Sequence, residues 1–526
     1  MNKALKIILS VIFSLFILIF VAGLAAPFFL DDYAEEKLIE EFSNQTDDRF
    51  QLDFSDLQIG FWKGSLTVDS IVIAPKNASG FKVVSATKLV IGDISWLSFW
   101  NKPKPDFGSI FIKEPVFELY SRDFSSLSFS EFSSGEDSAQ TNYPDIDFSI
   151  ENGTVKILYP KGGEEFSLEN FNLDLQQLNL NAIINNSSDH YLRDFSFSGE
   201  DLTYMMEDIL YSFTIDEFDF QSSAQLFSVG NFAMTPILPK YEFSKIRSRQ
   251  LDRYDVEVAE MMIKGFEPDS LFSGIVELDS LIVREGKMEI FRDKNKPKAP
   301  GISTKPLVND MAKKIRFPFA VNVAVVSNSS IVYEEHKPPS EKSGHISFED
   351  LEATLSNFRS ATHPDFNETT LTLHVETYFM GASLLNVDVH YPIFNEDNTH
   401  YLKAHLESIN PQEASEMLEN VGFVRVEDGI VHELSAEMEL NENSSSGEVT
   451  LLYSDLNVSM LDENDPDKNG IKEQVSNFIA NTFVIKTNNL PEDPRIGTFE
   501  YERDPEKSIF AYWWKSLQSG LEASIR

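Results

Sequence analysis

Short segments in which apolar and polar side chains alternate fill the chain from about residue 50 onward, and this period of two is typical of strands. In one segment, Leu66, Val68 and Ser70 are expected on one face of a strand and Ile71 on the other. Residues rich in Asn, Gly, Pro, Ser and Asp separate the segments, for example at 76–80, 159–163 and 441–447. The pattern predicts a mainly β fold built from many short strands.

Several of the predicted strands are apolar on both faces, among them residues 110–112 and 281–283. A sheet that has one face in water needs apolar side chains on the other face only. We therefore expect one face of these strands to pack on a helix or sheet and the other to contact something else that is apolar.

The sequence also repeats itself at long range. Residues 109–120 match residues 280–291 without a gap, and both stretches are expected to form a strand, a turn at Pro115 or Gly286, and a second strand. Two further pairs of similar segments follow in the same order, at 150–155 and 326–331 and at 166–171 and 346–351. Residues 81–180 and 250–357 are thus predicted to be two copies of one β-rich unit, which stack edge to edge into a long sheet.

Residues 7–30 carry no charge, and this run of about 24 residues would form a helix about 36 Å long, enough to cross a bilayer. Lys3 and Lys6 precede the run and acidic residues follow it, which predicts a cytoplasmic amino terminus and a non-cytoplasmic remainder. A cleaved signal peptide is the alternative, but the run exceeds the usual apolar region of such peptides, about 7–15 residues long. The mean hydropathy of −0.22 argues against further spans.

Helical periodicity appears at a few places. Ala34, Leu38 and Phe42 share one face of a predicted amphipathic helix, and residues 411–419 are predicted to form a short helix. We predict a cytoplasmic tail at residues 1–6, a transmembrane helix at 7–30 and an amphipathic helix at 31–45. A first β-rich unit is predicted at 46–245, a second β-rich unit with late strands at 246–504, and a C-terminal amphipathic helix at 505–526.

The predicted C-terminal helix is rich in aromatic residues, with Tyr512, Trp513 and Trp514 in succession. Two interpretations stay open for these side chains. They cap the open edge of the last strand, which would otherwise invite aggregation, or they lie in a membrane interface or against a partner.

Composition excludes several classes of function. The net charge of −40 is unsuited to a nucleic-acid partner, and the absence of cysteine excludes disulfides, thiolate zinc sites and a cysteine nucleophile. No G-x-S-x-G, H-E-x-x-H or Gly-rich phosphate motif occurs, and no carboxylate pair stands out, so we predict neither an enzyme nor a cofactor.

Metal sites are weakly indicated at two places. Four histidines lie fairly close in the sequence without a ligand spacing, so no metal site is predicted from them: His374, His390, His400 and His405. Residues 465–470 match the start of a calcium loop, but Ser476 replaces its bidentate glutamate, so a polar connection is favoured over calcium.

Taken in order, these features resemble the AsmA-like family of bacterial envelope proteins. The features that carry the resemblance are the N-terminal anchor, the acidic helix through Phe42, and the segments at 56–68, 86–91, 96–100, 110–120 and 447–458. They cover most of the chain, and they are hydrophobic patterns rather than catalytic signatures.

Membership of this family would imply a relationship to bridge-like lipid transfer proteins. The implied fold is a long curved antiparallel β-sheet that forms an open groove, with an apolar inner face that holds lipid acyl chains. The implied protein is anchored in the inner membrane, extends into the periplasm, and contributes to lipid transport and outer-membrane biogenesis. Our candidates for the groove are Ile110, Ile112, Leu281, Val283 and Leu451. The alternative function is an envelope scaffold that binds other proteins through its sheet edges.

Overall fold

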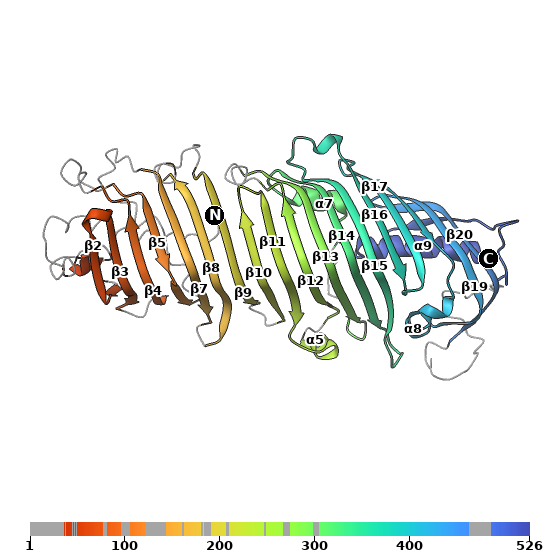
Figure 1. The fold of residues 1–526 in the computed structure, drawn as a ribbon. Coiled ribbons are helices and arrows are strands. Elements are labelled where there is room, and N and C mark those ends of the chain that lie inside the picture. The colour runs from red at the N-terminus through yellow and green to blue at the C-terminus, as the bar shows by residue number, and fades with distance from the viewer. Residues whose placement is uncertain are drawn as a thin grey trace. The chain divides into compact units, whose positions relative to one another are not determined.

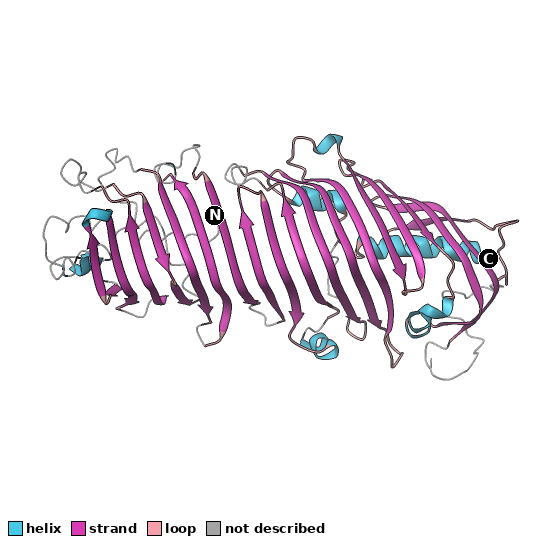
Figure 2. Cartoon of the chain, viewed as in Figure 1, coloured by secondary structure: helices cyan, strands magenta, loops and turns pink. Residues whose placement is uncertain are grey.

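The computed structural model describes residues 36, 38–40, 42–44, 46, 48, 50–76, 81–95, 106–120, 144–159, 162–179, 182, 191–206, 210–246, 249–266, 274–297, 304–461 and 485–526. Strands dominate these residues, which confirms the mainly β prediction (Figures 1 and 2). The chain divides into two compact units, unit 1 (Met1–Val229) and unit 2 (Gly230–Arg526). The strand β11 (Leu226–Pro236) contains the division point, which the sequence analysis placed at 245/246.

The predicted transmembrane helix and the calcium-like loop at 465–470 both lie outside the described residues. Within the described part, no helix combines the length and the apolar character that a membrane span requires. Residues 36, 38–40 and 42–44 are helical, and the side chains of Leu38 and Phe42 are buried.

Unit 1 contains a sheet in which most strands pair with the strand that follows in the sequence. Its strands are β1 (Phe50–Asp53), β2 (Asp56–Gly60), β3 (Ser65–Pro75), β4 (Phe81–Gly92), β5 (Ser109–Lys113), β6 (Val116–Tyr120), β7 (Ile146–Leu158), β8 (Glu164–Leu178), β9 (Asp194–Met205) and β10 (Tyr211–Gln221). A 3₁₀ turn, η1 (Phe61–Lys63), connects β2 to β3.

Unit 2 contains a second run of neighbouring strands and most of the described helices. Its strands are β12 (Asp252–Lys264), β13 (Val276–Asp293), β14 (Phe319–His336), β15 (Gly344–Arg359), β16 (Thr370–Phe379), β17 (Ser383–Pro392), β18 (His400–Leu406), β19 (Val424–Leu440), β20 (Ser444–Met460) and β21 (Gly497–Glu502). The helical elements are α5 (Lys240–Ile246), α7 (Val308–Lys314), η4 (Phe366–Glu368), η5 (Pro411–Ala414), α8 (Ser415–Asn420) and α9 (Ile509–Ile525). The predicted short helix at 411–419 is therefore present as η5 and α8.

The pairing is mixed, which corrects the prediction of a wholly antiparallel sheet. β5 and β6 both pair in parallel with β7, and β13 pairs in parallel with β14. The other strand pairs that the structure describes are antiparallel. A parallel pair needs a long connection, because the chain must return to the end at which the first strand began. Residues 121–145 and 294–318 supply that length, and the second connection includes α7.

The two predicted copies share this unusual topology. In each, one strand pairs in parallel with the next, which then pairs antiparallel with a third, as β5/β6–β7–β8 and as β13–β14–β15. Residues with positive φ recur at matched positions: Glu114 and Glu285, Asn152 and Asn328, and Asn170 and Asp350. The internal repeat is therefore confirmed in the backbone conformation as well as in the sequence.

These left-handed residues overturn two details of the sequence analysis. No turn separates the strands at Pro115 or Gly286; β13 runs straight through, and β5 and β6 lie along the same two neighbouring strands. Ser70 has a φ of 55°, which shifts the alternation by one residue, so Ile71 is buried like Leu66 and Val68. The left-handed residue changes which side chains share a face, and the register between β3 and β4 is the same on both sides of it.

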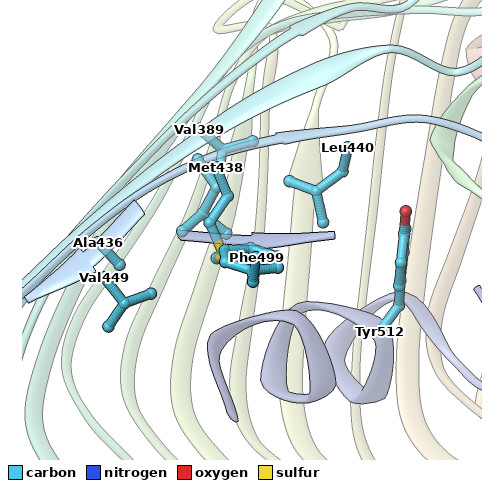
Figure 3. Close-up of a cluster of buried hydrophobic side chains, with 8 residues drawn as sticks. Val389, Ala436, Met438, Leu440, Val449, Phe499 and Tyr512 are labelled. Carbon is cyan, nitrogen blue, oxygen red and sulfur yellow. The ribbon is translucent and has the colours of Figure 1, made fainter. Parts of the chain in front are cut away.

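Helices lie on both faces of the sheet in unit 2. The helix α9 lies on the inner side of the curved strands (Figure 3), and α7 packs through Ala312 against Leu371 and Tyr391 on the same face. The helix α5 packs against the opposite face, where Tyr241 contacts the ring of Phe291. We call the face under α9 the inner face and the face under α5 the outer face.

Candidate functional site

Two rows of apolar side chains cross the inner face of unit 2, and each row consists of direct cross-strand partners. We call the two rows together the apolar floor. From β12 to β21, the first row is Ile263, Leu281, Ala324, Leu355, Leu373, Val389, Leu402, Met438, Gly447 and Phe499. From β12 to β20, the second row is Met261, Val283, Val326, Ala353, Val375, Val387, Ala404, Ala436 and Val449.

Neither row contains a charged or hydrogen-bonding side chain. Ten strands at a spacing of about 4.8 Å give the floor a length of about 43 Å across unit 2. A strip of this size without any polar side chain selects for an apolar partner, because burying polar groups against it would leave them without hydrogen bonds.

Exposure of the floor changes along its length. Near α9 the side chains are buried, with Val389, Met438 and Val449 exposed by 2%, 5% and 0%. From β12 to β15, in contrast, the floor side chains are only partly buried, including Leu281 and Val283. Hydrocarbon surface in this part of the floor therefore remains accessible.

The helix α9 covers the far end of the floor with a stripe of small residues and one tyrosine. Tyr512, Ser516, Gly520 and Ser524 recur every four residues and are buried. The Ser516 hydroxyl lies 2.6 Å from that of Ser445, and the Ser524 hydroxyl accepts the backbone N–H of Leu451 at 3.1 Å. The stripe lets the helix backbone approach the strands closely, and Tyr512 joins the cluster of Figure 3.

His400 fixes the first turns of α9 to the sheet. Its imidazole stacks on Tyr391 with 4.5 Å between ring centroids, and its Nε2 accepts the indole N–H of Trp513 at 2.9 Å. The backbone oxygen of Asn398 lies 2.8 Å from Nδ1, so Nδ1 carries the proton. Burial lowers the pKa of His400 to about 4, which keeps the ring neutral as this geometry requires.

Unit 1 has an apolar face built in the same way. One row of direct partners is Leu66, Ile91, Ile110, Phe148, Leu175 and Phe195, and a second is Val68, Leu89, Ile112, Ile150, Leu173 and Phe197. On β3 to β7 the side chains of both rows are at most 4% exposed. The side chains on β8 and β9, such as Leu175 and Phe197, are only partly buried.

The candidate groove residues lie at different places in these rows. Ile110 and Ile112 are members of the rows in unit 1 and are buried there. Leu281 and Val283 are members of the floor in its partly exposed part. Leu451 is two residues beyond Val449 on β20, at the end of the floor that α9 covers, and its backbone N–H bonds to that helix.

The aromatic candidates of the tail divide between the two sides of α9. Tyr512 and Trp513 face the sheet, whereas Trp514 is 56% exposed. The helix lies across the inner face of β20 and β21, and its exposed side also carries Phe510 at 71% exposure.

The other histidines are spread over the strands. His374 lies 2.8 Å from the Asp388 carboxylate and His405 lies 3.7 Å from that of Glu433, all on exposed side chains. In the part of the chain that the structure describes, no three His, Cys, Asp or Glu side chains are placed to share a metal ion.

A depression of about 570 Å³ lies in unit 1 on the face opposite Ile110 and Ile112. Polar side chains line most of it, and they bond one another: Asn170 donates to Glu200 at 2.9 Å, and Asn172 accepts the backbone N–H of Asn152 at 3.0 Å. The apolar floor is the more extensive feature, and it has no such internal partners.

Sequence reasoning found single members of the floor and missed the rows. The sequence did not indicate that Met261, Ile263 and Val326 belong to the floor. A row is defined by the register between strands, which a local sequence pattern does not contain. Comparison of the sequence with protein-family models and with curated proteins gives no match.

Proposed function

We propose that the apolar floor of unit 2 binds the hydrocarbon chains of membrane lipids, and that the protein is a lipid-handling protein rather than an enzyme. The observation that carries the proposal is that the two apolar rows of the floor are only partly buried between β12 and β15. Soluble proteins rarely leave such a large apolar patch in water unless it binds something. The apolar rows of unit 1, partly exposed on β8 and β9, extend the same role.

Energetics favour an acyl chain as the ligand. Each CH₂ group moved from water onto an apolar surface contributes about 0.8 kcal/mol, so a chain that leaves a bilayer for the floor loses little of its burial. Passage through water would forfeit the whole sum. The proposed role is therefore to carry lipid between membranes, with residues 7–30 as an inner-membrane anchor, the bulk of the chain in the periplasm and a contribution to outer-membrane biogenesis.

A photoreactive amino acid placed on β13 tests this function. We expect benzoylphenylalanine at Leu281 or Val283 to form adducts with lipid in membranes, detected by mass spectrometry of the purified protein. Ile282 is the matched control, because it lies between these two residues on the same strand and points to the outer face. Lipid adducts of equal yield at all three positions would contradict the proposal.

The alternative scaffold function predicts a different product. Adducts with another protein, without lipid, at Leu281 and Val283 would favour that function. Val283→Asp gives an independent measurement: the amount of lipid that co-purifies should fall several-fold, while Ile282→Asp should leave it unchanged.

A further inference from the structure

A row of charged side chains borders the apolar part of unit 2 near one end of β12, β13 and β14. Asp252, Arg292 and Glu335 are direct cross-strand partners, and we call them the charged row. The row one step inward is Tyr254, Ile290 and Tyr333, and the next is Val256, Met288 and Ile331. Charge therefore meets an apolar surface at this boundary.

The charged row lies on the inner face, as the floor does. The left-handed residues Glu285 and Asn328 shift the alternation, so that Met288, Ile290 and Arg292 continue the face that begins with Leu281 and Val283. The intervening side chains Phe291 and Asp293 contact α5 on the outer face, through the ring of Tyr241 and the hydroxyl of Ser244.

The row is closely paired and poorly hydrated. The Arg292 guanidinium bonds both oxygens of Asp252 at 2.5 Å, and the Glu335 carboxylate lies 2.6 Å from Lys294 and accepts the Tyr333 hydroxyl at 2.7 Å. The Glu335 and Asp252 side chains are only 6% and 21% exposed. Burial and the neighbouring Glu335 raise the pKa of Tyr333, so its hydroxyl stays protonated as a donor.

Charge balance decides which head group this boundary accepts. Arg292 and Lys294 supply two positive charges, and Asp252 and Glu335 supply two negative ones. An added anion would leave one excess negative charge in a half-buried site, which costs free energy. A head group with one charge of each sign can replace the existing ion pairs without adding net charge. Its anionic group bonds to Arg292 and Lys294, while its cationic group bonds to Asp252 and Glu335.

We propose that the charged row binds the head group of an amphiphile that carries both a phosphate and an ammonium group, while its chains lie on the apolar surface next to it. This inference rests on the proposed function and adds a selection among lipids. The phosphate would bond Arg292 and Lys294, and the ammonium would bond Asp252 and Glu335.

Displacement of a bound fluorescent fatty acid from the purified full-length protein tests the proposal. The competitors are dioleoyl phosphatidylethanolamine, dioleoyl phosphatidylglycerol and dioleoylglycerol, which share their chains. We expect the ethanolamine lipid to displace the probe at a concentration about tenfold lower than the glycerol phospholipid, as charge-assisted hydrogen bonds imply.

Two sets of variants assign this preference to the row. Asp252→Asn with Arg292→Gln should reduce the tenfold ratio to about one, without altering displacement by dioleoylglycerol. Glu260→Gln with Arg284→Gln is the matched control, because this ion pair joins the same two strands on the outer face. Glu335→Gln alone leaves Asp252, Arg292 and Lys294 with an excess positive charge, and it should shift the preference toward the anionic lipid.

The outcomes separate this proposal from the proposed function. Displacement by all three lipids with equal strength, or an equal loss of preference in the control pair, would overturn the charged row as a head-group site and leave the floor as a chain-binding site. Failure of every lipid, dioleoylglycerol included, to displace or replace the probe would overturn both.

Discussion

At the scale of single residues, His400 shows how one buried side chain connects distant parts of unit 2. Its two ring nitrogens have fixed roles, one as donor to Asn398 and one as acceptor from Trp513. Protonation of Nε2 would point its N–H at the indole N–H of Trp513. It would also place a positive charge in an apolar cluster, where the positive charge of Arg503 further lowers the pKa of His400. The contact between β18 and α9 therefore depends on a neutral ring.

The free energy of unfolding is expected to depend on pH through His400. In the unfolded chain its pKa is about 6.5, and in the folded protein it is about 4. Between these pH values the unfolded state binds more protons than the folded state. The contribution of His400 to the free energy of unfolding is therefore fully present above pH 6.5 and falls by about 3 kcal/mol as the pH drops toward 4. Urea unfolding at pH 7 and pH 4.5 measures this loss.

Substitution isolates the contribution of His400 from that of the many carboxylates. His400→Gln should show a smaller loss between the two pH values than the wild type, while His405→Gln, at an exposed histidine, should show the same loss. An identical loss in all three proteins would mean that His400 does not titrate in this range.

The chemistry of His400 was beyond the reach of sequence reasoning. In the sequence, His400 is only one of several histidines that lie near one another. Its hydrogen-bond partner Trp513 is 113 positions away in the chain, so no local pattern connects the two residues. Leu281 and Val283, in contrast, were predicted as groove candidates from their two-sided apolar strand, and both belong to the rows of the floor.

At the scale of elements, α9 owes its position to close backbone approach. A Cβ atom on Gly520 would lie 2.3 Å from a methyl group of Val449, and one on Gly497 would lie 2.1 Å from the backbone oxygen of Gly520. The helix begins after Ser508, whose hydroxyl accepts the N–H of Ala511 at 3.3 Å. The sequence predicted the helix over 505–526, but not the stripe of small residues through which its backbone approaches the strands.

Gly520→Ala is expected to destabilise the protein by about 1–2 kcal/mol. The new methyl group would overpack against Val449, whose branched side chain is stiff, and this cost exceeds the gain of about 1 kcal/mol from better helix propensity. Denaturant unfolding measures the change. Ser519→Ala, the adjacent position off the buried stripe, should be neutral or slightly stabilising, and a Gly520→Ala protein as stable as wild type would argue against close packing of α9.

The sequence predicted where strands occur, but it did not predict which side chains of a strand share a face along its whole length. Alternation in the sequence identified β3 and β20, because an apolar side chain at every second position is the direct signature of a buried face. Ser70, Glu285 and Asn328 adopt left-handed conformations inside strands, and nothing in their residue types requires it. Each of them moves the following side chains to the other face.

At the scale of the whole molecule, the mainly β class and the internal repeat were predicted from the sequence, because both follow from local patterns that recur. Accessibility of the apolar rows was not predictable, since it depends on which distant segment covers which strands. Leu281 and Leu451 have similar sequence surroundings, yet only Leu451 lies at the end of the floor occupied by α9.

This difference in cover predicts a difference in lipid contact. Benzoylphenylalanine at Leu451 should give several-fold fewer lipid adducts than at Leu281, because α9 occupies the space next to it. The two positions should give equal protein yields in the purified samples, which controls for expression. Adducts at Leu451 as abundant as at Leu281 would indicate that lipid, rather than the helix, occupies that end of the floor.

The matched left-handed residues of the repeat have a consequence for binding. Glu285 and Asn328 lie side by side on β13 and β14, and Asp350 follows on the next strand, so left-handed residues form a line across these three strands. This line determines which side chains of each strand reach the inner face. We expect the protein without cargo to present the same side chains there, so that loading a molecule requires no change of strand register.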